Sequence, residues 1–268
     1  MTSTLFENHS DGGHREVEPN SVSQFLVLTN RVVWNLINTG QMVIAIITPV
    51  IFTLGFYLPL KYVMGFRGID YAQFVMPIIA LQTMGFTMMS NAQIAAFETL
   101  SGLNSRLQTM PISALVPLAS RMTGGMIRSA VSLGVAIGFG YLIGFRFDAG
   151  FWQGVFFVVF TFALGTVLSL GADALGILTK SPESLSQVLA LPTLIFGMLS
   201  TGFVPETGFP EWIRPFVRNQ PISQFAVSMQ EMTTDGVTFD VFWPALAWLC
   251  GLAVVFAPLA IWANGRRE

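Results

Sequence analysis

The chain has 268 residues, of which 53% are hydrophobic and only 10% charged, and its mean hydropathy is +0.63. Water-soluble domains rarely have so little charge, so this composition predicts an integral membrane protein. The net charge of −2 and the absence of any lysine- or arginine-rich block exclude nucleic acid as a partner.

Residues 1–20 are polar and carry four acidic residues before the first apolar stretch. A secretory signal needs a basic start followed directly by an apolar core, so we expect no cleaved signal here. We expect a polar, cytoplasmic tail over residues 1–20, followed by a single transmembrane domain over residues 21–268.

The segment Ser21–Asn38 distributes its polar and apolar residues with the period of a helix. Gln24 and Arg31 fall on one face of that helix, and Val32 and Leu36 fall largely on the other. An amphipathic helix of this kind is typical of the membrane interface, where it lies in the plane of the bilayer. The alternative is that the segment is an N-terminal extension of the first span.

Six apolar runs are long enough to cross a bilayer core about 30 Å thick as helices. They lie within residues 32–60 (mainly from Gln41 onward), 71–97, 129–145 (with a possible earlier start near Thr123), 149–178, 185–204 and 241–263. None of them alternates like a strand of a membrane barrel, so we predict an all-α protein with six transmembrane helices.

The distribution of basic residues predicts the orientation of these spans. With six spans both termini lie on one side, and eight of the 13 lysines and arginines fall on that side, Arg121 and Arg128 among them. Because cytoplasmic loops carry the excess of positive charge, we place both termini in the cytoplasm.

The link between the second and third spans, residues 98–121, has a helical pattern of its own. Its apolar residues follow helical spacing until Pro111, which cannot continue a helix: Leu100, Leu103, Leu107 and Met110. A short amphipathic helix projecting from the membrane would offer a soluble partner the anchors that groove docking needs. The alternative is an ordinary loop lying on the lipid head groups.

The connector between the last two spans, residues 203–240, is too long and too patterned for a slack linker. It is rich in proline, and Arg214 and Arg218 stand four apart on an expected short helix. Trp212 and its aromatic neighbours suit the head-group level of a bilayer. We expect short re-entrant or interfacial helices at the outer leaflet, and the alternative is a membrane-surface loop without a functional role.

The residues that carry common enzyme chemistry are missing from the apolar part of the chain. Neither Lys61 nor Lys180 follows a glycine, so there is no phosphate-binding loop of the form G-x-x-x-x-G-K-[ST]. Both histidines, His9 and His14, lie in the polar tail, which excludes histidine-dependent zinc or triad chemistry. We expect a chain that is not itself an enzyme and that binds no cofactor or metal.

Asp173 is the only clear charge inside a predicted span. We expect it to be paired, to cap a helix or to reach the interface, rather than to relay protons. A proton relay would be a feature of an ion-coupled secondary transporter, which remains an alternative function, together with a membrane scaffold that transports nothing.

Two stretches of the sequence resemble one known family. Residues 200–205 and 210–216 and the run Asn219-Gln220-Pro221-Ile222-Ser223 resemble the signature that follows the fifth span of type-2 ABC permeases. The resemblance is closest to the daunorubicin-resistance type, which includes mycobacterial phthiocerol dimycocerosate exporters. Gly102, Leu107, the run 110–113 and Arg121 resemble the family's coupling region, although Glu98 alone stands where the family has a denser charged cluster.

This resemblance implies roles for particular residues. The contact with a cytoplasmic ATPase is expected at Glu98, Gly102, Arg106, Leu107, Met110, Pro111, Ser113 and Arg121. The outer re-entrant segment is expected to include Pro205, Pro210, Trp212, Arg214, Asn219 and Pro221.

The resemblance also implies an assembly and an activity. Two ABC ATPase subunits, which bind ATP and Mg²⁺, would join this permease and a second copy of it or a homologous sister permease. The complex would be an ATP-driven exporter in the plasma membrane that carries a lipid or a hydrophobic drug outward.

Overall fold

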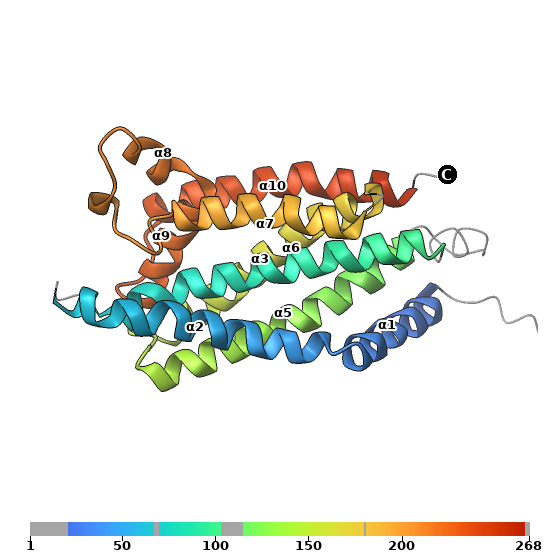
Figure 1. The fold of residues 1–268 in the computed structure, drawn as a ribbon, viewed down its shortest axis with the longest axis horizontal. Coiled ribbons are helices and arrows are strands. Elements are labelled where there is room, and N and C mark those ends of the chain that lie inside the picture. Colours follow the sequence, from blue (N-terminus) through green and yellow to red (C-terminus); the bar gives the residue numbers. More distant parts are fainter. Residues whose placement is uncertain (1–20, 67–69, 103–114, 180, 266–268) are drawn as a thin grey trace, which may run out of the picture.

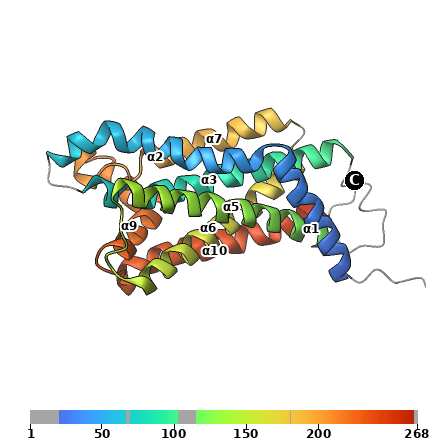
Figure 2. The same ribbon diagram turned by 90° about the horizontal axis from the view of Figure 1, so that it is seen from below.

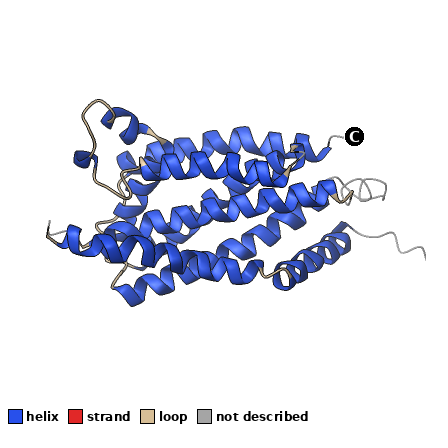
Figure 3. Ribbon diagram, in the orientation of Figure 1, coloured by secondary structure: helices blue, strands red, loops and turns tan. Residues whose placement is uncertain are grey.

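A computed structural model describes residues 21–66, 70–102, 115–179 and 181–265 of the chain. Over these residues the protein consists of helices and loops, without strands, as Figure 3 shows, and the all-α prediction is confirmed. The elements are α1 (Ser21–Asn38), α2 (Gln41–Gly65), α3 (Tyr71–Leu100), α5 (Leu115–Ile143), α6 (Phe151–Leu178), α7 (Pro182–Met198), the 3-10 turn η1 (Glu206–Gly208), α8 (Arg214–Asn219), α9 (Pro221–Thr233) and α10 (Phe239–Gly265).

The long helices lie side by side along the longest axis of the molecule and form one bundle (Figure 1). We call the end of the bundle at which α10 finishes, and near which α1 lies, the terminal end. The opposite end, which carries α8 and α9, is the far end. Helices α3, α6 and α10 run toward the terminal end, and α2, α5 and α7 run away from it.

Five of these helices are long and apolar enough to cross a membrane: α2, α3, α5, α6 and α10. Helix α7 has 17 residues, fewer than the roughly 20 that a bilayer core needs. Five of the six predicted spans are therefore matched by helices of spanning length and composition.

Capping residues explain where several helices begin. The carboxylate of Asp70 accepts a hydrogen bond from the backbone N–H of Ala72 and starts α3. Ser181 caps α7, and Pro182 occupies its first turn, where a missing N–H costs nothing. These are local signals, because each cap lies within three residues of the backbone group that it satisfies.

Helix α1 is separate from α2 and lies across the terminal end of the bundle (Figure 2). The chain turns at Gly40, whose φ of +72° lies in the left-handed region that favours glycine. Leu36 is buried against α5, whereas Trp34 and Ile37 are more than half exposed. The bounds of α1 match the predicted segment, and the alternative in which it extends the first span is wrong.

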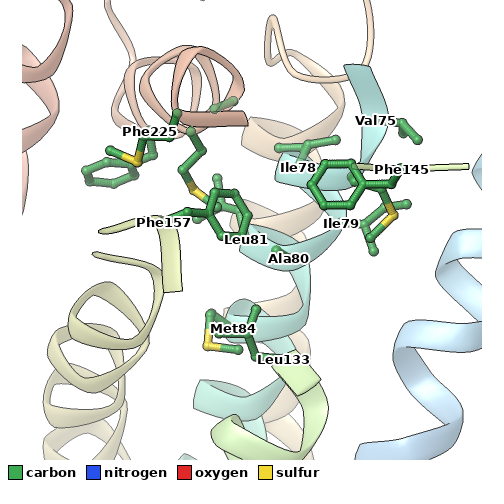
Figure 4. Close-up of a cluster of buried hydrophobic side chains, with 14 of the residues drawn as sticks. Val75, Ile78, Ile79, Ala80, Leu81, Met84, Leu133, Phe145, Phe157 and Phe225 are labelled. Carbon is green, nitrogen blue, oxygen red and sulfur yellow. The ribbon is translucent and has the colours of Figure 1, made fainter. Parts of the chain in front are cut away.

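Helix α3 forms the centre of the bundle. In its most apolar stretch 78% of the residues are buried, against 11% for α10. Figure 4 shows the core around α3, where Phe145, Phe157 and Phe225 come from other elements. Helix α6 comes close to α3 because it carries glycine at position 176, where a Cβ would collide with the backbone carbonyl of Ala92.

Helix α5 begins at Leu115, and its candidate span, Val116–Ile143, starts earlier than the predicted Ser129 or Thr123. Arg121 and Arg128 were assigned to a loop because charges inside lipid are costly. Both are buried within α5 and contact protein groups instead of lipid. Removing them from the eight basic residues on the terminal side leaves six against five, so the charge bias no longer supports an orientation.

Candidate functional site

A buried ion pair joins α5 to α6 near the terminal end of the bundle. The guanidinium of Arg121 donates from Nε to Oδ1 of Asp173 at 2.7 Å and from Nη2 to Oδ2 at 3.2 Å. Arg121 is 6% exposed and Asp173 is 1% exposed. Two parallel hydrogen bonds of this kind form the strongest and most directional arrangement of an arginine and a carboxylate.

Two further residues complete this cluster, which we call the terminal-end network. Asn264 of α10 accepts a hydrogen bond from Arg121 Nη2 at 2.5 Å and donates to Asp173 Oδ2 at 3.0 Å. Glu98 of α3 accepts from Arg121 Nη1 at 3.3 Å. The network therefore connects four helices, α3, α5, α6 and α10, through side chains alone.

Small residues let these helices approach closely enough for short side chains to meet. Ala174 of α6 packs in one cluster with Ala260 and Ala263 of α10, and all three are at most 1% exposed. Asn264 directly follows this contact, which brings its amide within reach of Asp173. The packing of the three alanines thus positions Asn264 for its hydrogen bond to Asp173.

The terminal-end network corrects the prediction that Asp173 is the only clear charge within a span. Arg121 lies inside the candidate span Val116–Ile143 and Asp173 inside Phe151–Leu178. A charge in this position is tolerated when it is paired and its remaining hydrogen-bond capacity is used, as it is here. Of the roles considered for Asp173, pairing is the one that the geometry supports.

Three of the eight coupling residues expected from the sequence are described, and they lie at this same end: Glu98, Gly102 and Arg121. Glu98 and Arg121 are brought together, and Gly102 ends the turn after α3 with a φ of +71° and its N–H donating to Thr99 O. The other five lie outside the described residues: Arg106, Leu107, Met110, Pro111 and Ser113. The described part of the segment therefore leads directly from the terminal-end network.

The proline-rich connector at the far end contains short helices, as the sequence predicted. Pro205 precedes η1 and Pro210 the turn to α8, while Trp212 is 81% exposed. Arg214 donates from Nε to Phe209 O at 2.9 Å and holds the turn that leads into α8. Asn219 donates within α8 to its own helix.

Helix α9, which begins at Pro221, inserts into the bundle rather than lying on its surface. Phe225, Met229 and Met232 are all at most 2% exposed and belong to the main core. Gln230 donates to the backbone carbonyl of Phe74 in α3 at 2.9 Å. The far-end connector is thus packed against the central helix.

Sequence reasoning missed the role of Gln220. Its Nε2 donates to the carbonyls of Leu199 at 2.6 Å and Phe196 at 3.2 Å, which are the unpaired acceptors at the end of α7. Ser223 accepts from the backbone N–H of Thr201 at 3.1 Å. The Gln-Pro-Ile-Ser run therefore ties the end of α7 to the start of α9.

Arg128 was also missed as a functional candidate. It is 3% exposed and extends from α5 to hydrogen-bond partners on α2 and α3. Arg121 and Arg128 stand seven residues apart, so they share one face of α5. Two arginines on one face of an apolar helix were a readable signal for buried partners.

No group of residues suited to a metal ion occurs in the described ranges.

Comparisons with known proteins agree with this architecture. The profile of a family described as ABC-2 family transporter protein matches residues 69–262. The chain is 36% identical over 260 residues to the doxorubicin resistance ABC transporter permease protein DrrB of Mycobacterium tuberculosis, over 88% of this chain and 90% of that protein. It is 29% identical over 232 residues to the daunorubicin resistance ABC transporter permease protein DrrB1 of Streptomyces coeruleorubidus, over 82% and 78% respectively. Since these matches cover most of the length on both sides, the chain belongs to the ABC-2 family of transporter permeases, in its daunorubicin-resistance type.

Proposed function

We propose that this chain is the membrane subunit of an ATP-driven ABC exporter that moves a lipid or a hydrophobic drug outward across the plasma membrane. The observation that carries the proposal is the 36% identity to a doxorubicin resistance permease over 88% of the chain. ATP and Mg²⁺ would be bound by two separate ATPase subunits, and this chain would make or break no bond itself.

The working form of the chain has six spans, with α7 as the fifth. Helix α6 ends at the terminal end, where Asp173 contacts Asn264, and α10 starts at the far end. The chain must return between them, and α7 is the only described helix that lies along that path (Figure 1). Its 17 residues, extended by the turn at Ser200, suffice in a thin or locally compressed bilayer.

We place the terminal end in the cytoplasm. Both ends of the described chain then lie where the ATPase subunits are, and α1 lies at the inner interface with Trp34 and Ile37 toward lipid. The far end would face the outer leaflet, where Trp212 and Phe216, both exposed, serve as interfacial anchors, and α8 and α9 form the outer re-entrant segment.

Coupling would pass from the ATPase through the segment between α3 and α5 into the bundle. Glu98 and Arg121 stand on either side of that segment, and Arg121 Nη1 lies 3.3 Å from Glu98 Oε2. A movement of the segment would act on α6 and α10 through Asp173 and Asn264, because the terminal-end network joins all four helices. A contiguous network of packed and hydrogen-bonded side chains can carry such coupling.

A second permease chain, either identical or a sister, would cover part of the exposed apolar surface. Val188, Leu191 and Leu194 of α7 are each more than half exposed, as are Val254 and Val255 of α10. Lipid would cover the rest of this surface, and the substrate route would lie between the two permeases.

The proposal is tested by affinity purification of the tagged chain in several mild detergents. We expect an ATPase with a phosphate-binding loop to copurify in stoichiometric amount, and the assembly to hydrolyse ATP. A pure permease without an ATPase in every detergent would contradict the proposal and favour the ion-coupled transporter or the scaffold.

Substitutions in the coupling segment test the assignment of residues separately from the assignment of function. Pro111→Ala and Arg106→Gln should abolish export while expression and membrane insertion stay at the level of the unmodified protein. Arg218→Gln is the matched control, because it removes an exposed charge at the far end. Export that survives replacement of the whole coupling segment would disprove the coupling role and leave the exporter assignment standing.

A further inference from the structure

Arg128 is a buried cation without a counter-ion in the described part of the chain. It lies in the candidate span Val116–Ile143 and is 3% exposed. Arg121, which lies seven residues earlier on the same face of α5, is paired with two carboxylates. By contrast, no described carboxylate lies within ion-pair distance of Arg128. An unpaired charge in a membrane span is costly, which makes it a candidate for binding a ligand.

The hydrogen bonds of Arg128 go to neutral acceptors only. Nη1 donates to Gln41 Oε1 at 2.8 Å and Ser90 Oγ at 2.7 Å, and Nη2 donates to Thr87 O at 2.7 Å and to Asn91 Oδ1. Nε is buried and has no partner. These bonds hold the guanidinium in place but leave its charge uncompensated and one donor unused.

Beside this guanidinium lies a cavity of about 40 Å³ between α2, α3 and α5. It is larger than the ~10–15 Å³ that a single water requires. Polar groups line it, among them Gln41, Thr48 and Ser132, and so do the apolar side chains of Ile44 and Phe86. The cavity can therefore hold a small polar group beside an apolar continuation.

The surroundings of the cavity indicate how a ligand would enter. Ile44 on its rim is 62% exposed, and Val43, Ile47 and Ile51 of the same spanning helix are also exposed. An inorganic anion would have to leave water and cross this apolar surface, at a high desolvation cost. An amphiphile could keep its hydrocarbon against α2 while its head group reaches Arg128.

We propose that the pocket at Arg128 binds the anionic head group, a phosphate or a carboxylate, of an amphiphile whose hydrocarbon chain lies against α2. Arginine is suited to such oxygen anions, because its planar donors match their geometry. A resident membrane lipid and a transported amphiphile would present the same chemistry to this pocket. The inference requires only that these helices lie in a bilayer, so it does not depend on ATP-driven export.

The test measures the thermal unfolding midpoint of the full chain, purified in dodecyl maltoside, with increasing amounts of four additives. Dodecyl phosphate and laurate supply the two anionic head groups, dodecylphosphocholine supplies a zwitterionic one, and inorganic phosphate supplies the free anion. We expect the midpoint to rise in a saturable manner with dodecyl phosphate or laurate, and not with the other two. An equal rise with dodecylphosphocholine, or with inorganic phosphate, would overturn the proposal.

Variants locate the effect within the molecule. Thr48→Phe fills the cavity and leaves every hydrogen bond of Arg128 in place, so it keeps the test valid if Arg128→Gln fails to fold. Each should weaken the apparent affinity about tenfold or more, as loss of one charge-assisted hydrogen bond does. Arg31→Gln, which removes an exposed charge of α1, is the matched control and should leave the affinity unchanged. Unchanged binding in Thr48→Phe would place the ligand elsewhere.

Discussion

At the scale of single residues, the terminal-end network shows how a membrane helix carries an arginine and an aspartate without exposing either to lipid. The four donor contacts of Arg121 all end on oxygen atoms of Asp173, Asn264 or Glu98. Each of these polar groups would be costly to bury alone, and in the network each one supplies a hydrogen-bond partner to another. The ion pair between Arg121 and Asp173 thus allows α5 and α6 to pack against each other with both charges buried.

The variant Asp173→Asn tests this interdependence. It leaves Arg121 buried with only the partly exposed Glu98 as a carboxylate partner, so we expect a loss of stability on the order of 3–5 kcal/mol. The loss would be measured as a lower unfolding midpoint in detergent. Glu211→Gln is the control, because the carboxylate of Glu211 is 91% exposed and lies 3.8 Å from Arg214; it should change stability little.

The double variant Arg121→Leu, Asp173→Leu distinguishes pairing from proton relay. Removing both charges together should cost less than removing Asp173 alone, because neither partner is then left buried and unpaired. A double variant that is as stable as the unmodified chain but inactive in transport would point to a chemical role for Asp173. Strictly additive losses would show that the two residues do not act as a pair.

At the scale of helices, the position of α1 depends on a glycine of α5. A Cβ on Gly124 would lie too close to the side chain of Val32, so only glycine lets α1 approach to this distance. Leu36, the other residue of α1 beside Gly124, is 2% exposed. The interfacial helix is therefore held by shape complementarity to the bundle as well as by its own amphipathic pattern.

Gly124→Val should detach α1 from α5. The added methyl groups cannot fit beside Val32, so we expect the amide hydrogens of α1 to exchange faster with solvent than in the unmodified chain. Gly134→Val is the matched control, because the same helix has open space at Gly134. Equal exchange of α1 in the two variants would mean that Gly124 does not hold it.

The sequence predicts an element well when the interactions that form it are between residues close together in the chain. Helices α1, α3 and α6 were found within a few residues of their ends, because apolar period, capping and run length are local patterns. The inclusion of Arg121 in the third candidate span was missed because its partner, Asp173, is 52 residues away, and a single sequence does not reveal that pairing. The same holds for Gln220, whose acceptors lie at the end of another helix.

At the scale of the whole molecule, the two ends of the bundle differ in kind. The terminal end carries the buried charges and α1, whereas the far end carries the aromatic and proline-rich connector with α9 packed into the core. Because Arg121 and Arg128 are buried, basic residues alone no longer decide which end faces the cytoplasm. The orientation therefore has to be measured, and the exposed residues at each end provide the positions.

Cysteine labelling with a membrane-impermeant maleimide in intact cells measures both the orientation and the number of spans. Cys250, which is exposed, is first replaced by serine, and single cysteines are then placed at Ser101, Glu183 and Glu211. With the terminal end in the cytoplasm and α7 crossing the bilayer, Glu211→Cys reacts in intact cells. Ser101→Cys and Glu183→Cys react only after permeabilisation.

Each departure from this pattern has a distinct meaning. Labelling of Ser101→Cys and Glu183→Cys in intact cells, with Glu211→Cys protected, would invert the orientation and leave six spans. Labelling of Glu183→Cys and Glu211→Cys on the same side would show that α7 does not cross, because Glu183 lies in its first turn and Glu211 lies beyond its end. In that case the bundle would cross the bilayer five times, and α6 and α10, which run in the same direction, could not both span it in the arrangement of Figure 1.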